Sequence, residues 1–175
     1  MTNNRKTPRA DWLDYEGGFY FITICTTGMK HFFGKVVDGK MELSDVGRIV
    51  DYELANPSLH HPDIKITDYV VMPNHIHAIV RCDAPDPAEI SNPGGLRTVN
   101  PAQRPVADEP RHVTRLCRYV GSMKSAVTRA ARKINPAFGW QTRYHDHYIR
   151  GSHDFDNIRA YIANNPEKWE EDRFK

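Results

Sequence analysis

Residues 69–80 read Tyr-Val-Val-Met-Pro-Asn-His-Ile-His-Ala-Ile-Val, and this stretch decides how the rest of the chain can fold. Two runs rich in apolar and β-branched residues flank Pro73-Asn74, a pair that favours a tight turn. The pattern therefore predicts a hairpin whose two strands cover residues 64–72 and 75–81.

The second strand of this hairpin carries two histidines separated by one isoleucine. Side chains alternate across a strand, so His75 and His77 share one face, about 7 Å apart along the chain. Ile76, Ala78 and Val80 point to the other face, where they suit packing beneath helices. The histidines are therefore expected on an open face, where two imidazoles can share one metal ion.

Similar patterns predict the remaining elements. A run of aromatic and β-branched residues bounded by glycines indicates a buried strand at 19–27. Ser44 resembles an N-cap, and apolar residues at helical spacing follow it until Pro57. A basic amphipathic helix is expected at about 113–133, a strand at 140–150, and a last helix at about 154–164 capped by Ser152.

The order strand, helix, strand, strand, helix, strand, helix predicts the fold class. Its first six elements match the split βαβ arrangement of the ferredoxin-like fold, an α+β architecture with an antiparallel sheet and helices on one face. The last helix is additional. We expect residues 1–175 to form a single domain, interrupted at 84–110 by a flexible insertion that holds six of the twelve prolines.

Composition limits the class of protein. The chain has 175 residues, of which 39% are hydrophobic and 26% charged, as in a soluble globular domain. No apolar run approaches the roughly 20 residues that span a membrane. The first twelve residues lack the apolar core of a secretory signal. Three widely separated cysteines argue against a disulfide framework. These features together predict a cytoplasmic protein.

Charge is unevenly distributed along the chain. The net charge is only +2, but residues 111–150 hold nine of the 24 Lys and Arg and one acid, Asp146. That segment therefore carries +8, and the remainder carries −6. Such asymmetry is typical of a protein with a polyanionic partner.

Four motifs, taken together, resemble those of one known family. They are the hairpin at 69–80, GSMKS at 121–125, WQ at 140–141 followed by DH at 146–147 and IR at 149–150, and YIANNP at 161–166. In this order they resemble the HUH-class single-tyrosine transposases, in which two histidines flank a hydrophobic residue. The branch of REP-associated tyrosine transposases fits best. The resemblance runs from about residue 18 to 169, apart from the 84–110 insertion.

The resemblance implies a catalytic tyrosine, Tyr161, that attacks a DNA phosphodiester and leaves a 5′-phosphotyrosine and a free 3′-OH. An ordinary tyrosine has a pKa near ~10 and is a poor nucleophile at neutral pH without help. The phosphotyrosine conserves bond energy, so the same enzyme can rejoin strands. Tyr144 and Tyr148 are the competing nucleophiles.

The same resemblance implies a divalent cation, Mg²⁺ or Mn²⁺, that polarises the scissile phosphate. His75 and His77 supply two ligands. Asn165 is the candidate third ligand because it lies four residues beyond Tyr161 and shares a helical face with it. Asp146 or His147 is the rival.

The expected partner is single-stranded or hairpin-forming DNA, bound by a monomer or a homodimer that is associated with the nucleoid. For Trp140, burial in the core is the alternative to stacking on an unpaired base. The candidate DNA contacts are Lys124, Arg150, Arg115, Arg118, Trp140 and Tyr144.

Three alternatives remain open at this stage. His145 and His147 form a second triplet that a zinc ion can use. The chain can also be a DNA-hairpin-binding regulator that has kept the fold and lost turnover. Lastly, it can be a ferredoxin-like module without a nucleic-acid partner, whose basic helix is merely solvated.

Overall fold

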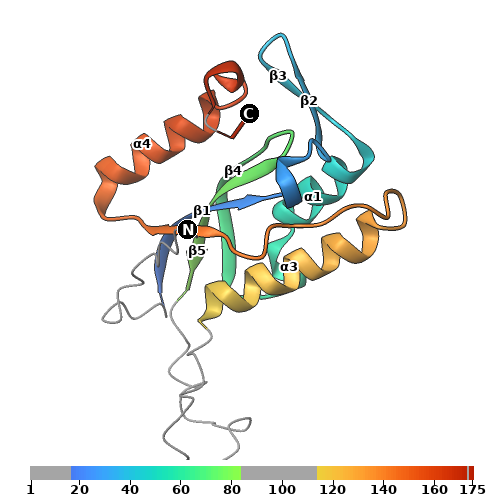
Figure 1. Ribbon diagram of the computed structural model, residues 1–175. Helices are drawn as coiled ribbons and strands as arrows, with labels where there is room; N and C mark the ends of the chain where they lie inside the picture. Colours follow the sequence, from blue (N-terminus) through green and yellow to red (C-terminus); the bar gives the residue numbers. More distant parts are fainter. Residues whose placement is uncertain (1–16, 84–113, 173) are drawn as a thin grey trace, which may run out of the picture.

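The computed structural model describes residues 17–83, 114–172 and 174–175, so the insertion predicted at 84–110 lies outside the described residues. Four strands form an antiparallel sheet in the order β4-β5-β1-β6 (Figure 1). This is the strand order of the split βαβ arrangement, which confirms the predicted fold class. The strands are β1 (Gly18–Cys25), β4 (Ile64–Val71), β5 (His75–Cys82) and β6 (His145–Tyr148).

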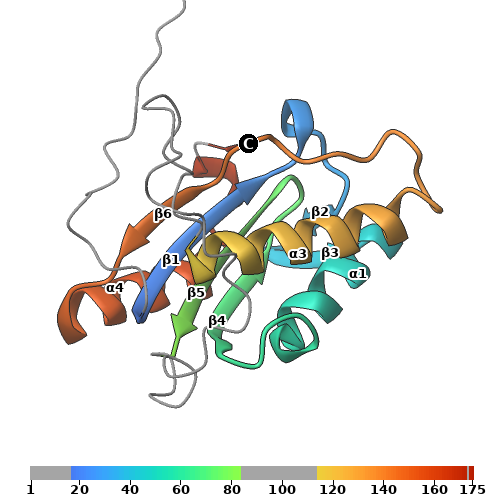
Figure 2. The ribbon, with the colours of Figure 1, turned by 90° about the horizontal axis from the view of Figure 1, so that it is seen from below.

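Helices cover both faces of this sheet. Two of them, α1 (Asp45–Ala55) and α3 (Arg115–Ala131), pack on one face. The last helix, α4 (Gly151–Asn164), lies on the other face, as the two views together show (Figures 1 and 2). The described residues also contain the short 3₁₀ turns η1 (Thr27–Met29), η2 (Pro57–Leu59) and η4 (Trp169–Glu171).

The main core lies between the sheet and the helices α1 and α3. Alternate residues of the two central strands supply the sheet side of this core, and all are completely buried. They are Tyr20, Ile22, Ile24, Ile76, Ala78 and Val80. A smaller cluster of Ile79, Ile149 and Ile162 joins the other face to α4. The alternation predicted from the sequence of β5 is therefore present.

A second hairpin, β2 (Gly34–Val37) and β3 (Lys40–Leu43), was not predicted. Its turn is Asp38-Gly39, and both residues have positive φ, 49° and 71°. An Asp-Gly pair is the usual signal for such a turn. The flanking runs are only four residues long and contain lysines, so they gave no clear strand pattern.

Two boundaries differ from the prediction around α4. The strand expected at 140–150 is regular only over β6, and Trp140 contributes a single bridge to Thr26. Ser152 is not the cap, because the helix begins at Gly151 and its N-cap is Arg150.

The carboxylate of Asp154 accepts hydrogen bonds from the Arg150 backbone N–H at 3.0 Å and from His147 Nε2 at 2.9 Å. The first of these bonds, with help from the second, lowers the pKa of Asp154. By contrast, Ser44 is the N-cap of α1, as predicted, and its hydroxyl accepts from the Gly47 N–H at 3.0 Å. Within the described residues, no helix has both the length and the apolar character needed to cross a bilayer.

Two helical glycines give a matched test of this packing. A Cβ on Gly47 would lie 2.1 Å from the Phe33 carbonyl oxygen, whereas a Cβ on Gly121 meets nothing within 4 Å. Gly47→Ala should destabilise the protein by about 1–3 kcal/mol despite the better helix propensity of alanine. Gly121→Ala should stabilise it by up to about 1 kcal/mol. Urea unfolding of both variants checks the opposite signs, and stabilisation by Gly47→Ala would contradict the packing of α1 on the Phe33 backbone.

Candidate metal and nucleophile site

The two histidines of β5 converge on the face that α4 covers. His75 Nε2 and His77 Nε2 lie 3.1 Å apart. The two residues are 0% and 1% exposed. Strand β5 places both imidazoles on one face, as its sequence predicts, but only the folded chain turns the two Nε2 atoms toward one point.

Hydrogen bonds at the opposite ring nitrogens hold this orientation. His75 Nδ1 lies 2.8 Å from Asn74 Oδ1, and His77 Nδ1 lies 2.9 Å from Thr23 Oγ1. The Asn74 Nδ2 group donates to the carbonyls of Met29 and Phe174, so its Oδ1 must be the acceptor end. We infer that His75 carries its proton on Nδ1, which leaves the Nε2 lone pair for a ligand.

A carboxylate from the end of the chain joins the pair. Asp172 Oδ2 lies 3.7 Å from His75 Nε2, and the side chain of Asp172 is 4% exposed. This oxygen has no hydrogen-bond partner among the residues that the structure describes. One ligand atom from each of His75, His77 and Asp172 lies within 4.8 Å of the others.

This donor set fits a divalent cation. The two Nε2 atoms, 3.1 Å apart, either share a proton in a hydrogen bond or, with a lone pair on each, require a cation between them. Ligands about 2.1 Å from an octahedral ion lie about 3.0 Å apart, close to the separation seen here. Partners at the outer ring nitrogens are the usual support of histidines that bind metals.

Sequence reasoning missed Asp172. It is one of four acids in the nine residues after Pro166, and no spacing rule separates it from Glu167, Glu170 or Glu171. Its position depends on how the chain turns back after α4, and the sequence pattern does not record that turn.

Tyr161 reaches the histidines from α4. Its hydroxyl lies 3.2 Å from His77 Nε2, and the residue is 43% exposed. Ile162, the next residue, is buried against Ile79 and fixes this part of the helix to the sheet. The ring of Phe21 stacks on His77 at 5.2 Å and meets Tyr161 edge-on at 6.1 Å. The structure thus brings together the predicted nucleophile and the predicted ligand pair.

Asn165, the third ligand expected from the sequence, is the C-cap residue of α4 and is 4% exposed. Its Oδ1 atom has no hydrogen-bond partner within the described part of the chain. The role of Asn165 as a metal ligand stays a prediction, and Asp172 is a second candidate for the same role.

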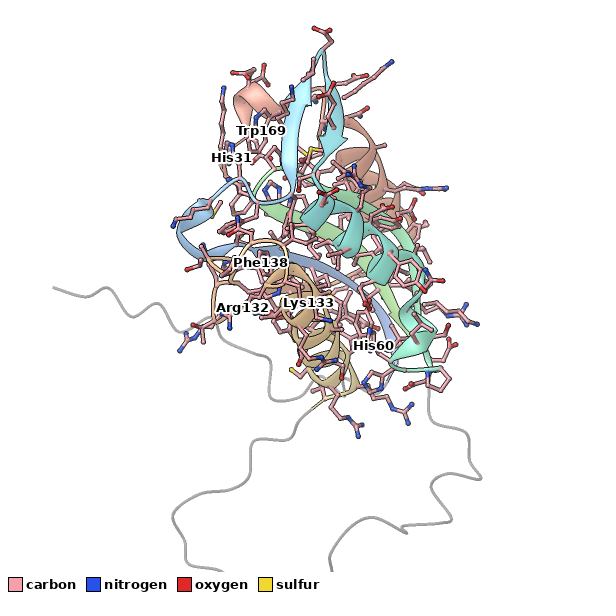
Figure 3. All side chains as sticks on the ribbon, turned by 90° about the vertical axis from the view of Figure 1, so that its right-hand side faces the viewer. His31, His60, Arg132, Lys133, Phe138 and Trp169 are labelled. Atoms are coloured by element: carbon pink, nitrogen blue, oxygen red, sulfur yellow. The ribbon has the colours of Figure 1, made fainter. Side chains whose placement is uncertain are left out.

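The end of the chain covers the histidine pair. The ring of Phe174 lies 4.8 Å from that of His75 and 5.9 Å from that of His77. The ring of Trp169 lies 6.2 Å from that of His75 and 5.6 Å from that of its neighbour His31 (Figure 3). These rings account for much of the burial of the two imidazoles.

The rival site residues lie elsewhere. Asp146 is paired with Ile22, whose side chain lies in the core beneath α1 and α3, so Asp146 projects to the face opposite the histidines. Tyr148 packs on Tyr20 on that same face. The side chain of His147 points to the face that α4 covers, but its Nε2 atom is hydrogen-bonded to the carboxylate of Asp154.

Several of the candidate DNA contacts bind other residues of the protein. Arg115 pairs with Asp63, and Tyr144 OH lies 3.2 Å from Cys117 Sγ. The indole of Trp140 packs with Phe33 and Phe138 and donates to the Lys124 carbonyl, which supports its burial in the core. The ammonium group of Lys124 donates to the Gln141 carbonyl at 2.7 Å, and burial lowers the pKa of this group.

The other two candidate contacts, Arg118 and Arg150, are exposed. Arg118 lines a hollow of about 610 Å³ on the outer side of α3. Arg129 and His60 line it too, and His60 lies at the opposite end of the molecule from Trp169 (Figure 3).

Comparison with known proteins adds the family. No model of a protein family matches the chain. An uncharacterized protein of Haemophilus influenzae is 32% identical over 173 residues, which cover 98% of this chain and 93% of the relative. The chain belongs to the same family as this protein. Because that relative is uncharacterized, membership of the family does not by itself assign an activity.

A solved structure shares the fold of this chain. The structure of a REP-associated tyrosine transposase bound to a REP hairpin superposes with a TM-score of 0.55 at 18% identity, covering 97% of this chain and 74% of that one. A candidate transposase of Deinococcus radiodurans covers 91% of this chain at 16% identity, with a TM-score of 0.44 that is too low to support an argument. This chain therefore has a transposase-like fold.

The geometry predicts which side chains determine metal affinity. Titration of Mn²⁺ followed by calorimetry should detect binding that His75→Ala and His77→Ala abolish. Thr23→Val, which keeps the shape and removes the acceptor at His77 Nδ1, should weaken binding about 10–100-fold.

Asp172→Asn and Asn165→Ala separate the two candidate third ligands, and Asp146→Asn on the opposite face is the matched control. Unchanged Mn²⁺ affinity in the histidine variants would contradict the site.

Proposed function

We propose that this protein is a metal-dependent endonuclease and strand transferase for single-stranded DNA, related to the REP-associated tyrosine transposases, that acts at hairpin-forming repeats. The contact between the Tyr161 hydroxyl and His77 Nε2 is the observation that carries this proposal. It joins a candidate nucleophile on α4 to a ligand pair on β5, although the two residues are 84 positions apart.

Tyr161 acts as the nucleophile in this proposal. Its oxygen forms a bond to the phosphorus of the scissile phosphodiester, and the bond from phosphorus to the 3′ oxygen breaks. The tyrosine loses its proton and the departing 3′ oxygen gains one, so the products are a 5′-phosphotyrosine and a free 3′-OH. The reverse attack by a 3′-OH rejoins strands without another energy source.

His75 and His77 hold Mg²⁺ or Mn²⁺, with Asp172 or Asn165 as the third protein ligand. A bound divalent cation offsets the negative charge that builds up on the phosphate. Asn74 and Thr23 orient the two imidazoles, and Phe21 and Ile162 fix the position of Tyr161 relative to them.

Access to the site depends on the end of the chain. Because His75 and His77 are 0% and 1% exposed, a phosphate reaches them only when Phe174 moves aside. Tyr161 itself is 43% exposed.

Cationic side chains support a DNA partner. Arg150 lies at the start of α4, on the same helix as Tyr161, and is exposed. Contacts of this kind with phosphates position DNA without reading its sequence. The solved structure with the same fold holds a DNA hairpin, which supports a hairpin as the partner here.

The test is a covalent trapping assay. Purified protein, Mn²⁺ and labelled single-stranded hairpin oligonucleotides are mixed, with Tyr161→Phe and His77→Ala in parallel. We expect a protein–DNA adduct that is absent in both variants. Tyr148→Phe is the matched control, since that ring lies on the other face of the sheet, and it should leave the adduct intact.

Other outcomes separate the alternatives. An adduct that survives Tyr161→Phe moves the nucleophile to Tyr144 or Tyr148. Salt-sensitive hairpin binding without any adduct favours a DNA-binding regulator that has lost turnover. Absence of both adduct and salt-sensitive binding excludes a nucleic-acid function.

A further inference from the structure

We propose that the hollow on the outer side of α3 binds the phosphate backbone of double-stranded DNA and holds the paired stem of a hairpin substrate. The hollow is separate from the metal and nucleophile site, because α3 and α4 lie on opposite faces of the sheet (Figure 1). The inference deepens the proposed function, on which the choice of a hairpin substrate rests. Binding of a stem is measurable without cleavage, so the two can fail separately.

The hollow has a volume of about 610 Å³ and two walls. One wall is formed by His60 and His61, which follow the turn η2, and the other by one stripe of α3. Ser122 Oγ lies 3.5 Å from His61 Nε2, so the two walls are in contact. The residues of the stripe recur every three or four positions and therefore share one helical face. They are Cys117, Arg118, Gly121, Ser122, Ser125 and Arg129.

Two exposed arginines stand at the ends of this stripe. Arg118 and Arg129 are separated by about three helical turns, so they lie on one face, about 16.5 Å apart along the helix axis. The Arg129 guanidinium donates to Ser125 Oγ at 3.0 Å, which holds the arginine along the stripe. Lys133, just beyond the end of α3, is exposed and extends the cationic surface (Figure 3). Cations at this spacing can reach phosphates on both sides of a DNA groove, since the major groove of B-DNA is about 12 Å wide.

The lining suits phosphates better than bases or a small molecule. Guanidinium groups only donate, and phosphate oxygens only accept. No carboxylate and no phenylalanine, tyrosine or tryptophan is among the described residues that line the hollow. The carboxylate of Glu53, which is hydrogen-bonded to His60, is 14% exposed and is not part of the lining.

The absence of aromatic rings from this lining decides between paired and unpaired DNA. Unpaired bases are normally held by stacking on aromatic side chains, and pockets for small molecules are mostly apolar and aromatic. A duplex stacks its bases inside and presents its phosphates outside, where cations and hydroxyl groups contact them. The lining of the α3 hollow therefore fits a duplex backbone.

Gly121, in the middle of the stripe, points to a partner that approaches closely. A glycine inside a helix costs about 1 kcal/mol relative to alanine. A Cβ at this position would meet nothing within 4 Å, so packing within the described part of the chain does not account for the glycine. Without a side chain, the backbone of α3 is open to close approach by a ligand. A glycine that the fold does not need, between two exposed arginines, indicates that a DNA backbone lies against α3 here.

The place of the hollow in the fold separates the stem from the strand that is cut. Tyr161 lies on α4, and the sheet lies between this helix and α3 (Figures 1 and 2). A stem bound to α3 therefore leaves Tyr161 accessible. The unpaired flank of the hairpin passes around the sheet to reach the nucleophile.

The experiment measures binding without cleavage. The full chain is titrated in EDTA with a fluorescently labelled blunt hairpin stem that has no single-stranded flank, and anisotropy is followed at several salt concentrations. Arg118→Gln and Arg129→Gln should each weaken binding and make the slope of log K against log salt shallower by about 0.9, and the double variant by about 1.8. Lys40→Gln is the matched control, because it removes the same charge from the β2–β3 hairpin, away from α3 (Figure 1), and it should leave affinity and slope unchanged.

A variant that keeps the charge tests the shape of the hollow. Gly121→Leu places a side chain in the hollow and improves the helix propensity of α3. It should weaken binding of the stem several-fold while the midpoint of urea unfolding does not fall. Loss of binding together with loss of stability would instead show that Gly121 has a structural role, and it would overturn this part of the inference.

The remaining outcomes distinguish the inference from its rivals. Wild-type affinity and salt slope in the arginine variants overturn it. It is also overturned if the variants lose binding of an unpaired strand as much as binding of the stem, or if inorganic phosphate displaces the stem as well as unlabelled stem does. Absence of a tyrosine adduct, with stem binding still sensitive to Arg118 and Arg129, refutes the nuclease and leaves this surface in place. An adduct with stem binding unchanged in the variants refutes only the surface.

Discussion

Two imidazole nitrogens held 3.1 Å apart are the constraint on which the candidate site of this protein depends. Bringing His75 Nε2 and His77 Nε2 to 3.1 Å is unfavourable for neutral rings unless a cation or a proton lies between them. The surrounding residues nevertheless hold the rings there. Asn74 and Thr23 bind the outer nitrogens, Phe21 stacks on one ring, and the end of the chain closes over both. Together with Asp172, the two imidazoles form a group that could hold a metal ion.

The antiparallel sheet keeps the free-energy cost of this arrangement low because its two faces have different roles. The alternate residues of β1 and β5 that point toward α1 and α3 are completely buried beneath these helices and supply most of the hydrophobic free energy. The alternate residues that point to the opposite face include the two histidines and only the small cluster around Ile79. The reactive face therefore contributes little to the core, and polar groups can converge there without a large loss of stability.

The basic residues are likewise divided between structural contacts and surface positions. The basic segment predicted from the sequence is real, but several of its members stabilise the fold: Arg115 pairs with Asp63, and Lys124 ties α3 to the loop before β6. Arg118, Arg129 and Arg150 stay at the surface, where cations contribute little to stability. A count of basic residues thus overstates the number available to DNA, because the count includes side chains that bind other residues of the protein.

The sequence by itself determined the sheet, its strand order and the face on which each residue of β5 lies, because alternation along a strand is a local property. It also located Ser44 as a cap, and it singled out His75, His77 and Tyr161 through short motifs. Only the tertiary structure decided that Asp172 joins the histidines, that Tyr161 meets His77, and that Asp146 and Tyr148 are separated from them by the sheet. These relations join residues from different elements, and their distances depend on how α4 and the chain after it pack on the sheet, which no spacing along the sequence can encode.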